Sequence, residues 1–229
     1  MPKIYLSPER RPQGHGKYWG MDLYEHDYCV EVARLTAQVL VRCGFEVKVE
    51  EDPDKSLERR VLEAIAWGAD CYLPLHTNAS SNGTKEGTAR GPLVLAYGEP
   101  DGVSWRACQA VYDRLMELYP DKGRGVVGGS PFYEIIRTPM LSIYPELAFH
   151  DNGQDAAWLV ANKSAIAAAL AKGLCDWYKM SYKEDNPATG VPEGWVRAEV
   201  YRAVVEKYQT LQAKHNALAD QIRGLINQL

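Results

Sequence analysis

Hydrophobic and polar residues alternate in short runs through the first 180 residues, and the runs change repeatedly between two periods. Around residues 3–7 and 45–50 the period is two, which is typical of strands, with Ile4 and Leu6 on one face and Tyr5 on the other. Other segments have helical spacing. The predicted strands are 3–7, 45–50, 71–75, 92–97, 134–137 and 140–145, and the predicted helices are 24–43, 56–67, 101–119 and 155–178.

Because strands alternate with helices, the pattern predicts an α/β fold: a twisted, mostly parallel sheet of about six strands with helices on both faces. Local signals mark some element ends. Gly44 is placed to stop the helix over 24–43, and Ser56 is placed to cap the next helix. Pro74 indicates that the strand over 71–75 lies at a sheet edge or ends there.

The last part of the chain has a different pattern. We predict a first domain over 1–180, a polar linker rich in Pro and Gly over 181–195, and an amphipathic helix over 196–229. Its heptad positions are Val204, Tyr208, Leu211, His215, Leu218, Ile222, Leu225 and Leu229. This spacing favours a coiled-coil homodimer, in which His215 would set the register. The alternative is a helix that folds back on the first domain.

Charge and composition narrow the function classes. The net charge of −4 argues against nucleic acid as a partner, since such proteins carry a basic stripe. No apolar run approaches the ~18 residues of a membrane span. The first residues lack the pattern of a signal peptide, and the five scattered cysteines fit reduced thiols. We therefore expect a protein made in the cytoplasm without a signal peptide.

Several candidate catalytic or metal-binding residues stand near the ends of predicted strands. His76 stands where the apolar run gives way to polar residues, and ligands of open α/β sheets bind at the carboxyl ends of strands. His15 follows the first strand between two glycines, and Glu25 begins the first helix. A catalytic zinc needs about three such ligands. The alternative for His76 is a surface or hydrogen-bonded histidine without a catalytic role.

Glu146 follows the apolar run 140–145. A buried carboxylate is costly unless it is paired or functional, so Glu146 is a candidate general base and acid. The alternative is a carboxylate that caps a helix or forms an ion pair.

Three blocks of residues resemble zinc-dependent N-acetylmuramoyl-L-alanine amidases. The resemblance spans about residues 1–178 and rests on 3–8 and 13–18 with Glu25, on 68–79, and on 146–159. It implies that His15, Glu25 and His76 hold Zn²⁺ and that Glu146 is the catalytic acid and base. It also implies that the substrate is bacterial peptidoglycan, cut between N-acetylmuramic acid and L-alanine. Zinc would activate water and polarise the scissile carbonyl.

The first block departs from the family's usual Asp-Pro-Gly-His-Gly, because His15 lies further from the first strand. His26 is a poor ligand candidate, and His150 is expected beside the site or facing substrate. An amidase without a signal peptide fits a phage or prophage endolysin, which reaches the cell wall after release. A heptad dimer would add avidity on a repetitive polymer.

Two other readings stay open. One is a different zinc hydrolase, such as a carboxypeptidase, which needs an arginine for the substrate carboxylate. Arg90 and Arg137 are its candidates. The other is a non-catalytic protein that binds the wall or serves a structural role through its helix.

Overall fold

A sheet with the strand order β2-β1-β3-β7-β4-β5, with β6 beside β3, is the framework of this protein in a computed structural model. The structure describes residues 1–10, 16–128 and 131–184. The strands are β1 (Lys3–Pro8), β2 (Glu46–Val49), β3 (Cys71–Asn78), β4 (Leu93–Ala96), β5 (Gly125–Gly128), β6 (Leu141–Ser142) and β7 (Tyr144–Phe149). The helices are α1 (Glu25–Arg42), α2 (Leu57–Trp67), α3 (Val103–Met116), α4 (Tyr133–Ile136), α5 (Gly153–Ala161) and α6 (Lys163–Tyr178).

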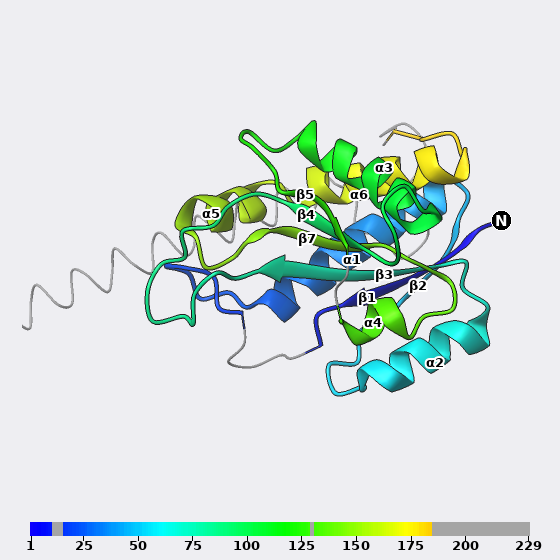
Figure 1. Cartoon of the computed structure of the whole chain (residues 1–229), viewed down its shortest axis with the longest axis horizontal. Helices are drawn as coiled ribbons and strands as arrows, with labels where there is room; N and C mark the ends of the chain where they lie inside the picture. The colour runs from blue at the N-terminus through cyan, green and yellow to red at the C-terminus, as the bar shows by residue number, and fades with distance from the viewer. Residues whose placement is uncertain (11–15, 129–130, 185–229) are drawn as a thin grey trace, which may run out of the picture. The chain divides into compact units, whose positions relative to one another are not determined.

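The sheet is mostly parallel, and helices lie on both of its sides, which confirms the predicted fold class (Figure 1). Among the recorded strand pairs, only β4 with β7 is antiparallel. The strands β1, β3 and β7 lie side by side in the middle of the sheet and run in the same direction. Their carboxyl ends therefore meet at one place, where a site can form.

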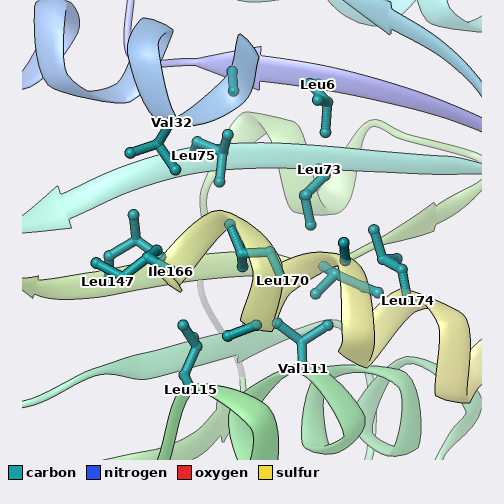
Figure 2. Packing of buried hydrophobic residues seen from close by; sticks show 14 of the residues in the cluster. Leu6, Val32, Leu73, Leu75, Val111, Leu115, Leu147, Ile166, Leu170 and Leu174 are labelled. Carbon is teal, nitrogen blue, oxygen red and sulfur yellow. The ribbon is translucent and has the colours of Figure 1, made fainter. Parts of the chain in front are cut away.

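The larger part of the core lies between the sheet and α1, α3 and α6. Figure 2 shows Leu6, Leu73 and Leu147 of the strands facing Leu170 of α6 and Val111 of α3. The opposite side holds a smaller apolar cluster, in which Tyr5 and Tyr72 pack against α2. The predicted division of β1 into an Ile4/Leu6 face and a Tyr5 face is confirmed.

The end signals near α1 and α2 are also confirmed. Gly44 has a φ of +95° just after α1, a conformation that glycine adopts without steric cost. The Ser56 side chain accepts a hydrogen bond from the Arg59 N–H at the start of α2. Both signals act locally, which is why the sequence could predict them.

Two predictions about the later elements are wrong. Residues 134–137 lie mostly in α4, a single helical turn, because Glu134 and Ile135 both point into the protein and Thr138 bonds back to the Glu134 carbonyl. The helix predicted over 155–178 is two helices. The chain turns at Asn162, whose side-chain amide donates to the Trp158 carbonyl.

Two strands also differ from the prediction. β3 continues through His76 to Asn78, and Pro74 lies inside it, in register with Ser7 of β1. The proline is tolerated because β3 changes partners there, pairing with β6 before it and with β7 after it. The short strand β5 was not predicted, since its sequence Gly-Val-Val-Gly is short and begins and ends with glycine.

The C-terminal predictions fall on residues 185–229, which lie outside the described residues. They include the helix over 196–229, the homodimer, the role of His215 and most of the linker. Within the residues that the structure describes, no helix is long and apolar enough to cross a membrane.

Close packing of α6 on α3 gives a stability prediction. A Cβ added at Gly173 would lie 2.6 Å from the Val111 Cα. Helix propensity alone favours alanine over glycine by about 1 kcal/mol. We expect steric overlap to reverse this sign, so that Gly173→Ala lowers the free energy of unfolding by roughly 1–3 kcal/mol in urea denaturation.

The control is Ser164→Ala, an exposed position of the same helix, where we expect a change within about 0.5 kcal/mol. A Gly173→Ala variant as stable as the parent would show that α3 and α6 are less closely packed than the structure indicates.

Candidate functional site

Three neighbouring strands present polar side chains at the same level of the sheet. His76 of β3 is in register with Glu146 of β7. Pro8 of β1 is in register with Leu75, so the next residue, Glu9, lies beside His76, and the Glu9 N–H donates to the Leu75 carbonyl at 3.0 Å. Side chains alternate along strands, so these three share one face of the sheet.

A candidate metal centre forms where Glu25 joins this row. The His76 Nδ1 lies 3.1 Å from Glu9 Oε2 and 3.4 Å from Glu25 Oε1. One ligand atom from each of these three residues lies within 4.8 Å of the others. Carboxylate oxygens and an imidazole nitrogen are ligands that zinc accepts. The donor set therefore fits a divalent cation such as Zn²⁺.

The backbone around Glu25 fixes the direction of its carboxylate. Glu25 is the first residue of α1, and its Oε1 accepts a hydrogen bond from the Thr77 N–H at 2.8 Å. The Gly16 carbonyl accepts from the Glu25 N–H at 2.9 Å. A Cβ at Gly16 would lie 2.5 Å from the Glu25 Cβ, and the φ of Gly16 is +65°. Glycine is thus required for this close approach.

His76 is enclosed by aromatic and acidic groups. Its ring stacks on Tyr144, with 4.6 Å between the ring centroids. Burial alone would lower the pKa of His76, but contacts with Tyr144 and with the carboxylates of Glu134, Glu25 and Glu9 hold it well above its usual value. These groups therefore favour the doubly protonated imidazolium, and a metal ion at Nδ1 would compete with the proton on that nitrogen.

Glu146 is a buried carboxyl group with an altered pKa. Burial, followed by the negative charges of Glu25 and Glu9, raises its pKa from 4.5 to about 8, although the His76 charge acts in the opposite direction. Its Oε2 has no hydrogen-bond partner within the part of the chain that the structure describes. A carboxyl group in this state can hold a proton or release it near neutral pH.

His150 lies behind the candidate ligand Glu25 and contacts it through Thr77. Its Nδ1 lies 2.9 Å from the Thr77 hydroxyl, and its ring stacks on Tyr18. Thr77 in turn bonds to Glu25 through its N–H. His150 thus contacts a residue that orients a candidate ligand, which agrees with the expectation that it lies beside the site.

Two cavities reach the candidate centre. The larger has a volume of about 1120 Å³ and is lined by Trp19, Met21 and the 78–84 segment together with Glu25, His76 and Glu146. The smaller, of about 170 Å³, lies along Phe132, Tyr133 and Glu134 and also reaches Glu25 and His76. Asp151 fixes the loop over the larger groove, since its Oδ2 accepts from the Ser80 and Ser81 N–H groups.

Three of the four predicted site residues converge, namely Glu25, His76 and Glu146. His15 lies outside the described residues. Sequence reasoning missed Glu9, although its place directly after the first strand was a usable signal. His26 was set aside as a ligand, and its Nδ1 lies 2.5 Å from the Glu9 carbonyl oxygen.

The arginines proposed for a carboxypeptidase can also be placed. Arg90 forms ion pairs with Asp155 and Asp121, and its pKa is raised by these partners and Tyr119 against the effect of burial. Neither Arg90 nor Arg137 lines either of the two cavities. The two arginines named for that alternative therefore do not support it.

Curated relatives are similar to this chain over most of its length. "Uncharacterized protein YqiI" of Bacillus subtilis (strain 168) is 27% identical over 69% of this chain and 77% of its own. "N-acetylmuramoyl-L-alanine amidase CwlM" of Bacillus licheniformis is 25% identical over 79% of this chain and 70% of its own.

A solved structure shares the fold. The N-acetylmuramoyl-L-alanine amidase from Clostridium difficile 630 aligns with a TM-score of 0.70 at 20% identity, covering 78% of this chain and 97% of the other. The family model described as N-acetylmuramoyl-L-alanine amidase matches residues 12–176, which is more than half of the chain. We conclude that this chain belongs to the N-acetylmuramoyl-L-alanine amidase family.

Proposed function

We propose that this protein is a zinc-dependent hydrolase that cuts the amide bond between N-acetylmuramic acid and L-alanine in bacterial peptidoglycan. Family membership supports amidase activity on peptidoglycan. The observation that carries the proposal is the register of His76 with Glu146, which places a protonatable carboxyl group beside the ligand cluster. A metal ion that activates water and a carboxyl group that moves the proton can act together when both lie in one site.

Glu25 and His76 would hold the metal ion, together with His15 as the sequence predicts. Glu9 is a further possible ligand, because its carboxylate lies within reach of the same centre as Glu25 and His76. When bound, zinc supplies a Lewis acid that polarises the scissile carbonyl and activates water.

Glu146 would move the proton. Its raised pKa lets the ionised form accept a proton from the attacking water and lets the protonated form deliver it to the leaving nitrogen of L-alanine. The unpartnered Oε2 is the atom available for this transfer. A single carboxyl group can thus serve as base and then as acid, with no covalent intermediate on the protein.

The larger cavity would hold the polymer. Its walls combine Trp19 and Met21 with polar groups of Asn78 and Asn82, a mixture suited to a glycan with attached peptide. The endolysin role and the homodimer through the C-terminal helix remain predictions of the sequence. Lysis of host cells on co-expression with a holin, and sedimentation of the full chain, would test them.

The second prediction concerns Glu146→Gln. We expect the release of free L-alanine amino termini from purified cell walls to fall at least about 100-fold, because the amide cannot accept or deliver the proton. Reducing sugars should not appear with either protein. Chelation should abolish activity of the parent protein, and added Zn²⁺ should restore it.

The matched control is Glu50→Gln, which changes another buried glutamate that lies outside both cavities and bonds to Tyr5 and Lys55. Full activity in Glu146→Gln, with its fold verified by circular dichroism, would remove Glu146 from the mechanism. Bound zinc without any wall cleavage would instead argue against the substrate.

A third prediction concerns the pH dependence of stability in the metal-free protein. The pKa of Glu146 is about 8 in the folded state, above its ordinary value of 4.5. The folded state thus binds this proton more tightly than the unfolded state, so stability is lost as pH rises from about 4.5 to 8. We expect Glu146→Gln to be more stable than the parent at pH 8, by roughly 1–4 kcal/mol, with little difference at pH 4.

Glu51→Gln provides a control of opposite sign. A hydrogen bond from Arg34 lowers the pKa of Glu51, so its stabilisation is present at neutral pH and is lost as pH falls. Chemical denaturation at several pH values would measure both. If the free energy of unfolding changed with pH equally in Glu146→Gln and the parent, Glu146 would ionise freely in the folded protein.

A further inference from the structure

We propose that Glu134 is a positioning residue of the metal centre, whose buried carboxylate holds the proton of His76 on Nε2 and so directs Nδ1 toward the metal ligands. The inference deepens the proposed function and rests on it for the metal. Glu134 lies outside the sequence blocks that resemble the family, and the sequence alone indicates no role for it.

The two nitrogens of the His76 ring face different groups. Nδ1 faces Glu9 Oε2 at 3.1 Å and Glu25 Oε1 at 3.4 Å, which are candidate metal ligands. Nε2 faces Glu134 Oε2 at 3.6 Å. The ring is thus oriented so that Nδ1 is the only nitrogen available to the candidate metal centre.

Glu134 is held rigidly for this task. It is 3% exposed, and its Oε1 accepts hydrogen bonds from the Ser7 hydroxyl at 3.0 Å and the Tyr72 hydroxyl at 2.9 Å. Its backbone carbonyl accepts from Ser142. Two strands and the turn of α4 therefore fix the carboxylate, and Oε2 is left to face His76.

The hydrogen bonding of the buried polar atoms supports the same role for Glu134. The Nε2 of His76 is buried and forms no hydrogen bond within the described parts of the chain, and its 3.6 Å separation from Glu134 is an ion pair slightly longer than a hydrogen bond. Within the described residues the Glu134 carboxylate receives two hydroxyl hydrogen bonds, and a buried carboxylate in this state remains costly. An N–H group of His76 directed at Oε2 offsets this cost and gives the ring a defined tautomer.

A purely structural role is the competing explanation, since Glu134 also joins β1, β3 and α4. Glu50 allows the two roles to be separated. It is likewise a buried glutamate that accepts from a tyrosine hydroxyl, that of Tyr5, but it pairs with Lys55 and lies outside both cavities. Loss of a buried hydrogen-bonded carboxylate is common to both variants, whereas a contact with His76 exists only at Glu134.

The informative substitution is Glu134→Gln. The amide oxygen is expected to keep the place of Oε1, because Ser7 and Tyr72 donate there. The amide N–H₂ then faces His76 Nε2 and favours a lone pair on that nitrogen, with the proton on Nδ1. The substitution thus inverts the tautomer that metal binding requires while it changes the side-chain volume very little.

The fourth prediction is the outcome for metal binding. We expect Glu134→Gln to bind Zn²⁺ about 10–100-fold more weakly than the parent in competition titration with a chelator, whereas Glu50→Gln binds it like the parent. In ¹⁵N-histidine spectra of the zinc-loaded parent, the His76 ring should show a protonated Nε2. This signal, assigned with His76→Asn, should shift or disappear in Glu134→Gln.

Other outcomes have distinct meanings. Equal zinc affinity and an unchanged His76 signal in Glu134→Gln would overturn the proposal, as would equal loss of affinity in Glu50→Gln. If the parent binds no zinc, the proposed metal centre fails. The ring proton of His76 in the metal-free protein then still tests Glu134: an Nε2–H that exchanges more slowly in the parent than in Glu134→Gln supports the contact, and equal exchange rates contradict it.

Discussion

The arrangement of this protein depends on one electrostatic imbalance: among the residues that the structure describes, several carboxylates lie around the imidazole of His76. Glu9, Glu25 and Glu134 all approach the ring of His76 within 4 Å, and Glu146 lies on the neighbouring strand. Among the described residues of this cluster, four carboxyl groups accompany the one imidazole of His76. The raised pKa of Glu146 is one consequence, since that group retains its proton to a higher pH. Room for additional positive charge is the other, and a divalent cation would supply it.

The sheet creates this imbalance through register. Parallel pairing aligns the carboxyl ends of β1, β3 and β7, and the alternation of side chains places Glu9, His76 and Glu146 on one face. The larger apolar core on the opposite face stabilises the strands and so meets the cost of burying the charges. The face with the smaller apolar cluster also holds the polar network of Ser7, Tyr72 and Glu134. One side of the sheet thus provides stability, while the other orients the chemistry.

Much of this could be predicted from the sequence, and the parts that could not share a physical cause. Periodicity predicted the strands around Ile4 and Leu6 and the helix α1, because burial of one face leaves a local pattern. Pro74 was misplaced because its tolerance depends on a change of partner between β6 and β7. The helical turn at Glu134 was missed because the side chains that bond to its carboxylate, Ser7 and Tyr72, lie 127 and 62 residues away in the chain. Contacts of that range leave no local signature.

The same reasoning explains why the candidate site was only partly visible. Glu25 begins a helix, and His76 and Glu146 each follow an apolar run. Each therefore had a local sequence signal, and the family resemblance connected the three. Glu9 had a local mark that was missed, because it directly follows β1. Glu134 faces His76 Nε2, and its meaning appears only when the two ring nitrogens are distinguished. Because a histidine ligand needs one nitrogen for the metal and an acceptor for the other, the residue that provides the acceptor belongs to the centre as much as the ligands do.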